Sequence, residues 1–253
     1  MIDTHTHLYS EILEPDISQV IERAKQNGIA KFYMPAIDKA THLKMMELES
    51  AYPDTLFSMI GLHPCSVKQD FLQEIEIIKE YLMQRKFVAI GETGLDFYWD
   101  KTFILEQYNA LEIQTELALQ YKLPLVLHTR DAMPETIDFI KKYKGTGLKG
   151  IFHCFGGSIS EAEQIIDCGF LLGIGGVLTY KKAGLDTVLE KINMQHIVLE
   201  TDAPYLSPVP YRGKRNESAY LIEVAKKLAV VKNMSLDEVD RITTANAEKL
   251  FGV

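Results

Sequence analysis

The amino-acid sequence predicts an α/β fold, a single-domain (β/α)8 barrel of the TIM type with an extra helix at its C-terminal end. Three observations predict it: eight short apolar runs, an amphipathic stretch after each run, and a length of 253 residues. A barrel of eight strand–helix units typically needs about 250 residues. We therefore expect one domain over residues 1–253.

The eight apolar runs are the expected strands, because each is short enough to be a buried parallel strand. They are residues 2–7, 30–36, 56–63, 87–92, 125–128, 150–153, 170–175 and 196–201. The amphipathic stretches are the expected helices, at 17–27, 39–51, 71–86, 103–121, 134–143, 159–168, 187–192 and 218–231, with the extra helix at 236–250. Asn27-Gly28 and Cys168-Gly169 are typical helix ends, and Ser235 with Glu238 forms a capping box before the last helix.

A doubly wound open sheet is the competing architecture. It predicts a glycine-rich phosphate turn directly after the first strand. The first strand is followed by residues 7–11, His-Leu-Tyr-Ser-Glu, and the first glycine is Gly28. The regular strand count and the absent glycine turn favour the closed barrel.

Composition and charge narrow the class of protein. With 47% hydrophobic and 25% charged residues the chain is an ordinary globular sequence, and its net charge of -8 argues against a broad basic surface for duplex DNA. A pair of bound divalent cations would add about four positive charges locally, so a phosphate-bearing substrate remains open.

The cysteines and the N-terminus predict a cytoplasmic protein. The three cysteines are scattered and form no disulfide or zinc-knuckle pattern. The N-terminus lacks the basic and apolar regions of a signal peptide, and no apolar run reaches the ~18 residues of a membrane span. Neither a membrane nor an obligate protein partner is implied.

Histidines and carboxylates occur at the C-terminal ends of the expected strands, where barrel active sites lie. His5 and His7 are two apart on the first strand and therefore share a face. Further polar residues of the same kind end or follow later strands: Glu92, His128, His153 and Asp202, with Glu200 on the face of Asp202. Six ligands exceed the four of a closed zinc site and suit two divalent cations ~3.5–4 Å apart.

Several other residues are expected near the centre. His63 ends the third strand, Arg130 follows His128, and a basic segment that includes Arg212 and Asn216 follows the eighth strand. These side chains are expected to bind an anionic substrate. Cys154 neighbours His153, and strand alternation is expected to turn it away from the site.

Together these motifs resemble the TatD family of metal-dependent deoxyribonucleases, within the amidohydrolase-type barrels. The matching segments, in family order, are IDTHTHL (2–8), GLHP (61–64), AIGETGLDF (89–97), HTRDA (128–132), FHCFGG (152–157), LETDAPYL (199–206) and RGKRNE (212–217). The family pattern usually continues with proline, whereas this chain has Ser218, which is expected to relax the loop before the last barrel helix.

The resemblance implies a TIM-type barrel that hydrolyses phosphodiester bonds. It implies as metal ligands the six residues reached above: His5, His7, Glu92, His128, His153 and Asp202. It implies that His63, Arg212 and Asn216 contact the substrate phosphate. A magnesium-dependent enzyme is implied, whereas the histidine-rich donor set favours zinc, manganese or cobalt, so magnesium, manganese and zinc stay open.

The sequence-based hypothesis is therefore a deoxyribonuclease that activates water with two metals, with Asp202 and Glu92 as the catalytic residues. By family analogy the substrate is a single-stranded DNA end, trimmed in the 3′ to 5′ direction. An amidohydrolase acting on a C–N or lactone bond is the rival enzyme, and a metal-stabilised scaffold without turnover is the rival from another class. Such amidohydrolases often carry a carboxylated lysine where this chain has Glu92.

Overall fold

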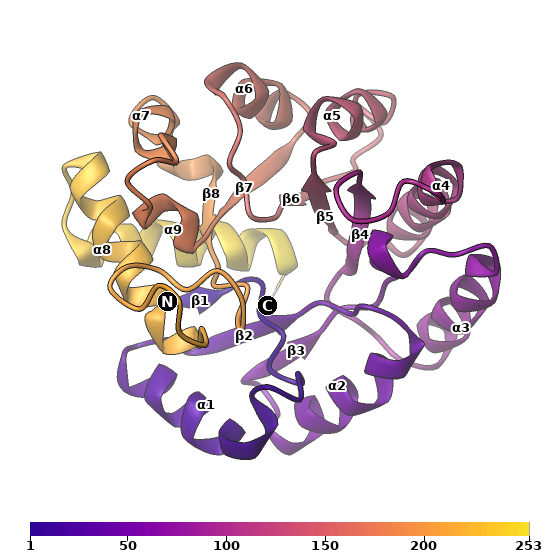
Figure 1. Cartoon of the computed structure of the whole chain (residues 1–253), viewed down its shortest axis with the longest axis horizontal. Coiled ribbons are helices and arrows are strands. Elements are labelled where there is room, and N and C mark those ends of the chain that lie inside the picture. Colours follow the sequence, from indigo (N-terminus) through magenta and orange to yellow (C-terminus); the bar gives the residue numbers. More distant parts are fainter. Residues whose placement is uncertain (253) are drawn as a thin grey trace.

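The structure, a computed structural model, describes residues 1–252, which form a closed barrel of parallel strands with helices around it (Figure 1). The strands are β1 (Ile2–Asp3), β2 (Lys31–Met34), β3 (Leu56–Ser58), β4 (Ile90–Asp96), β5 (Leu125–Arg130), β6 (Gly150–Phe152), β7 (Phe170–Ile174) and β8 (Ile197–Leu199). All eight expected strands are present, and the (β/α)8 prediction is confirmed. Most strands are shorter than expected, but β4 runs four residues further, to Asp96.

Helices follow the strands in regular alternation. They are α1 (Ile17–Gln26), α2 (Lys39–Ala51), α3 (Phe71–Gln84), α4 (Ile104–Tyr121), α5 (Met133–Lys141), α6 (Ile159–Asp167), α7 (Leu185–Leu189), α8 (Leu221–Lys232) and the extra α9 (Leu236–Phe251). Within residues 1–252, none of these helices combines the length and the apolarity needed to cross a lipid bilayer.

The expected helix ends are found where the sequence placed them. Gly28 after α1 has φ 81° and Gly169 after α6 has φ 87°, a left-handed conformation that glycine adopts without steric cost. The Ser235 hydroxyl accepts from the Glu238 backbone N–H, and the Glu238 carboxylate accepts from the Ser235 N–H. This capping box fixes the start of α9, and such a cap stabilises a helix by about 1 kcal/mol.

Backbone hydrogen bonds close the ring of strands. Strands β1–β2–β3 and β4–β5–β6–β7–β8 form two parallel sheets. At one seam the Gly91 N–H donates to the Ile60 carbonyl over 2.9 Å, and at the other the Thr4 N–H donates to the Leu199 carbonyl over 3.0 Å. The closed ring brings the ends of β1 and β8 together, although they are nearly 200 residues apart in sequence.

The two ends of the barrel interior differ in polarity. At the N-terminal end Val126, Ile151 and Val198 pack inward against Leu250 and Phe251 of α9, which passes behind the strands in Figure 1. Because successive side chains alternate along a strand, the residues two further on in the chain also point inward. The apolar residues that point inward at the N-terminal end of the barrel thus determine which polar side chains meet at its C-terminal end.

Candidate metal centre

A cavity of about 620 Å³ opens at the C-terminal ends of the strands. Five of the six expected ligands line it, and the sixth, His5, is fully buried beneath them against Glu92. The five are His7, Glu92, His128, His153 and Asp202. The volume is in the range of ordinary ligand pockets.

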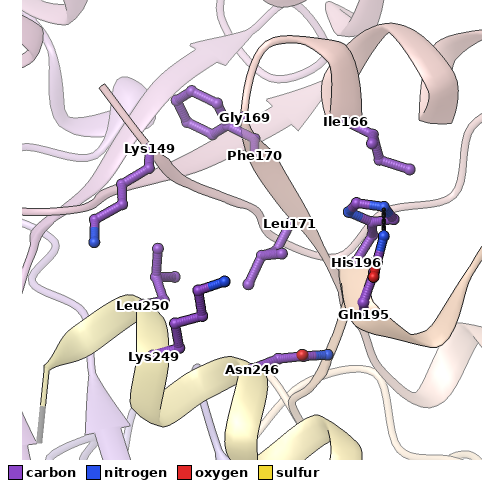
Figure 2. A pocket seen from close by; sticks show the side chains of 10 residues that line it. All are labelled: Lys149, Ile166, Gly169, Phe170, Leu171, Gln195, His196, Asn246, Lys249 and Leu250. Atoms are coloured by element: carbon purple, nitrogen blue, oxygen red, sulfur yellow. Dashed lines mark hydrogen bonds between the residues drawn. The ribbon is translucent and has the colours of Figure 1, made fainter. Parts of the chain in front are cut away.

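A second cavity, of about 390 Å³, lies at the opposite end of the barrel (Figure 2). It is lined by residues at the starts of β6, β7 and β8 and by α9, including Lys149, His196 and Lys249. No carboxylate lines it within residues 1–252. Its lysines would repel cations, so the metal chemistry belongs to the first cavity.

Glu92 lies between two groups of imidazoles. Its Oε2 is 3.1 Å from His5 Nε2 and 3.7 Å from His7 Nε2. Its Oε1 is 2.9 Å from His128 Nδ1 and 3.7 Å from His153 Nε2. The two oxygens of one carboxylate therefore face two different sets of donors, which is the arrangement of a bridging ligand.

Asp202 completes the set on the His5 side. Its Oδ1 is 3.5 Å from His7 Nε2 and 3.8 Å from His5 Nε2. It has φ 56°, in the left-handed region that aspartate tolerates better than most residues. The Asp202 side chain is 15% exposed, whereas that of Glu92 is 2% exposed. Both carboxylates line the cavity, and Asp202 is the one more exposed to solvent.

Hydrogen bonding fixes the tautomer of His7. The Tyr9 hydroxyl donates its single proton to the Pro35 carbonyl, 2.6 Å away. His7 Nδ1 lies 2.9 Å from the same hydroxyl oxygen and must therefore carry the proton between them. In neutral His7 the lone pair is then on Nε2, the atom that faces Glu92 and Asp202. This is the state that a metal ligand requires.

Glu200 holds His153 in place. Its Oε1 lies 2.9 Å from His153 Nδ1 and accepts the Cys154 N–H over 2.6 Å. Gly173 of β7 makes room for this carboxylate, since a Cβ there would come within 2.3 Å of Glu200 Oε2. With Nδ1 in ion-pair contact with Glu200, His153 presents Nε2 to the centre.

Asp96 holds His128 in the same way. Its Oδ2 is 2.9 Å from His128 Nε2, on the side of the ring opposite Glu92. The sequence-based prediction ended this strand at Glu92 and so missed Asp96. The GETGLD segment carried the signal, because Glu92 and Asp96 are four residues apart in one strand and share a face.

The histidines of the centre stabilise the ionised forms of its two carboxylates, Glu92 and Asp202. Burial by itself raises the pKa of Glu92, but His63, His5 and His153 outweigh it and hold that pKa well below its usual range. For Asp202, burial likewise opposes ionisation, but the contact with His7 and the charges of His153 and His5 outweigh it and lower the pKa. Both carboxylates are therefore anionic at neutral pH.

The residues fit divalent cations. Four groups of side chains offer ligand atoms that all lie within 4.8 Å of one another. Three of them contain Glu92 or Asp202: His5 with His7 and Glu92, His5 with His153 and Asp202, and His63 with Glu92 and His128. Imidazole nitrogens and anionic carboxylates are ligands of zinc, manganese and related ions. The centre therefore holds many buried ionisable groups in mutual contact, and the lone pair of His7 points toward them. This is the set of donor atoms that a metal site requires.

Metal binding is expected to release protons and to strengthen as pH rises. Burial lowers the pKa of His153, but Glu200 and Glu92 outweigh it and raise that pKa to about 10. Burial also opposes protonation of His128, yet its bonds to Asp96 and Glu92 raise its pKa. A cation must displace these protons, so between pH 6 and 8 affinity should rise by about tenfold per pH unit for each proton released. Calorimetry in buffers of different ionisation enthalpy measures the number of protons released on metal binding. A metal affinity independent of pH would contradict the assignment of His128 and His153 as metal ligands.

Among the residues predicted to bind substrate, the structure brings His63 and Arg130 to the cavity. His63 Nδ1 accepts the Cys65 N–H over 3.1 Å, so in the neutral ring Nε2 carries the proton and lies 3.3 Å from Glu92 Oε1. Burial lowers the pKa of His63, which keeps the ring neutral. His63 is therefore a hydrogen-bond donor at the cavity floor.

Arg212 and Asn216 are not brought to the cavity lining. The Arg212 guanidinium lies 3.9 Å from the centre of the Tyr180 ring, on an exposed turn. Asn216 is fully buried, and its amide donates to the Thr201 and Tyr205 carbonyls over 2.8 and 2.6 Å. With its amide N–H groups used in this way, Asn216 positions the loop after β8 rather than facing a phosphate.

Cys154 also departs from its prediction. It lies beyond the end of β6 with φ 49°, so strand alternation no longer sets its direction. Its thiol groups with His153 and Glu200 instead of pointing away from the centre. Burial, followed by the charges of Asp202 and Glu200, raises the pKa of this thiol well above its usual value, so it is a neutral neighbour of the centre.

Comparison with known proteins places this centre in a family. The sequence model described as "TatD related DNase" matches residues 2–252. The chain is 37% identical to "Uncharacterized metal-dependent hydrolase YabD" of Bacillus subtilis, over 100% of this chain and 99% of that protein. It is 29% identical to "Uncharacterized metal-dependent hydrolase YcfH" of Escherichia coli K12, over 100% and 96%.

A solved structure supports the same relationship. The crystal structure of YjjV, a TatD homologue from Escherichia coli K12, superposes with a TM-score of 0.94 at 28% identity, covering 100% of this chain and 98% of that one. The match therefore extends over all eight strands and over every residue of the centre described above. The chain belongs to the TatD family of metal-dependent hydrolases.

Proposed function

We propose that the protein hydrolyses phosphodiester bonds of DNA, removing nucleotides from the 3′ ends of single strands, with two divalent cations at the barrel mouth. The observation that carries the proposal is Glu92, whose two oxygens face separate sets of histidines. A closed structural zinc site needs only four ligands and no cavity. Here a cavity of about 620 Å³ stands directly over the donors.

Each side chain has a defined task in this proposal. His5, His7 and Asp202 would hold one cation, His128 and His153 the other, and Glu92 would bridge them. When bound, such cations polarise a phosphoryl oxygen and lower the pKa of a water molecule toward neutrality. Magnesium, manganese and zinc are the candidate ions.

Side chains of the protein would transfer the proton and stabilise the charge that develops during the reaction. Asp202 is anionic and partly exposed, so it can orient the attacking water and take its proton. The Nε2–H of His63, which lies 3.3 Å from Glu92 Oε1, would turn to a phosphate oxygen once cations bind Glu92, and Arg130 carries a full positive charge at the cavity edge. These two groups would bind the substrate phosphate and stabilise the charge that develops on it.

The shape and charge of the molecule favour a strand end over a duplex. A net charge of -8 does not provide the broad basic surface that a duplex requires. A single-stranded end can enter a barrel mouth as one extended chain. The three free cysteines suit a reducing compartment, and we propose the cytoplasm.

The test is a metal-dependence series on 3′- and 5′-labelled single strands, with duplex DNA, a cyclic amide and a lactone as further substrates. We expect loss of the 3′ label as single nucleotides, abolished by chelation and restored by one of the three candidate metals. Turnover of the lactone or amide but of no oligonucleotide would favour an amidohydrolase. Tight metal binding with no turnover of any substrate would favour a scaffold.

A further inference from the structure

Large aromatic side chains lie exposed at the mouth of the metal cavity. Trp99 is 67% exposed, Tyr98 52% and Tyr205 50%. Trp99 and Tyr205 line the cavity itself. Single exposed aromatic residues are ordinary, but several of them around one functional cavity indicate a ligand with flat apolar surfaces.

The first part of this aromatic mouth is tied to the metal centre through one carboxylate. The Tyr98 and Trp99 backbone N–H groups donate to Asp96 Oδ1 over 2.9 and 3.0 Å. The other oxygen of Asp96 contacts His128 Nε2 at 2.9 Å. The turn that carries the two rings is therefore held at a fixed place relative to the centre.

Arg130 adds a positive charge to the same side. Its guanidinium lies 4.0 Å from the centre of the Tyr98 ring and 5.3 Å from that of Trp99. Within residues 1–252 it forms no ion pair with a carboxylate. The rings preorder the guanidinium, and its charge stays available for an anion.

The second part of the aromatic mouth comes from the loop after β8. The Tyr205 N–H donates to the Asp202 carbonyl over 2.8 Å, and the Tyr205 carbonyl accepts from Asn216 over 2.6 Å. Its ring centre is 6.1 Å from that of His7. A second ring is thus fixed beside the metal ligands, on a loop distant in sequence from the first.

From this arrangement we infer that the aromatic mouth, made of Tyr98, Trp99, Tyr205 and Arg130, is a subsite for the nucleobase next to the scissile phosphate. The base stacks on the Trp99 ring, and Arg130 binds the scissile phosphate beside that base. Every base has a flat π face, so such a subsite accepts all four bases. The inference rests on the proposed function and adds how the strand end is recognised.

Trp99 provides a direct readout of binding, because it is the only tryptophan of the chain. The metal-loaded protein is titrated with a short single strand whose terminal linkage is a phosphorothioate, which slows cleavage. A matched strand carries an abasic residue at its 3′ end. We expect the normal strand to quench Trp99 fluorescence and the abasic strand to quench it weakly or not at all.

Kinetics on the same pair of strands, with ordinary linkages, give a second readout. A stacked base contributes enough binding energy that the abasic end should raise KM by about 5- to 150-fold. In Trp99→Ala this ratio should fall at least fivefold, and Trp99→Phe, which keeps a flat ring, should restore most of it. Leu105→Ala on α4, a residue 76% exposed and outside the cavity, should keep the wild-type ratio.

The outcomes separate this inference from the proposed function. If both strands are cut with equal KM and quench Trp99 equally, the subsite is refuted while the nuclease stands. If neither strand is cut, the nuclease proposal fails and fluorescence alone decides: quenching that needs the base supports the subsite, and base-independent quenching overturns it.

Discussion

Replacing Glu92 by glutamine is expected to abolish the pairing of metals and to lower kcat by about 10²–10³-fold or more. Glutamine has nearly the same shape but no negative charge and only one oxygen. It cannot face both the His5 group and the His128 group as the carboxylate does. Metal content per chain, measured by elemental analysis after gel filtration, should fall below that of the wild type.

The matched control for this variant is Glu47→Gln, which makes the same chemical change at an exposed position on α2. It should keep both metal content and activity. Circular dichroism shows whether Glu92→Gln remains folded, so that loss of metal is not confused with loss of fold. A Glu92→Gln protein with full metal content and normal kcat would refute the bridging role.

Asp202→Asn is expected to lower kcat by about 10²–10⁴-fold with a much smaller change in KM, because it removes a general base. Asparagine tolerates the left-handed φ of 56° at this position, so the loop after β8 should keep its conformation. Its amide oxygen can still approach a cation. The rate is measured at saturating metal, so that weaker metal binding does not account for the loss.

Asp138→Asn on the surface of α5 serves as the control for the Asp202 variant, since it removes the same charge far from the cavity. It should be indistinguishable from the wild type. If Asp202→Asn, fully loaded with metal, turns over near the wild-type rate, another group must accept the proton from water.

The sequence predicted the strands well because burial leaves a strong pattern. Each short apolar run became a strand, and the polar residues at the ends of the runs meet in one cavity. His128 and His153 follow the inward-pointing Val126 and Ile151 by two residues, as alternation requires. Periodicity within a strand is a local property, so it can be read from sequence alone.

Beyond the end of a strand, side-chain directions do not follow from alternation, and the predictions made there were right or wrong for other reasons. The first strand ends at Asp3, so His5 and His7 lie beyond it. His7 is held by Tyr9, and His5 stacks on His153, so both face Glu92 through these contacts rather than through alternation. Cys154 turns toward Glu200 because its φ is positive. The direction of a side chain past a strand end depends on such loop conformations, which composition and spacing do not encode.

Asn216 and Asp96 are the remaining differences between the prediction and the structure. Asn216 is a polar residue in a basic segment, which predicts a phosphate contact, but in the structure two carbonyls, of Thr201 and Tyr205, use its amide. Asp96 was missed because the predicted strand stopped at Glu92, four residues early. The partners of Asn216 depend on the conformation of the loop after β8, whereas Asp96 could have been predicted from its four-residue spacing from Glu92.

The most direct test of the metal centre is anomalous diffraction from crystals grown with manganese. The account predicts two peaks about 3.5–4 Å apart, one beside His5, His7 and Asp202 and the other beside His128 and His153, with the Glu92 carboxylate between them. A single peak, or none at Glu92, in protein that turns over with the same metal would contradict it.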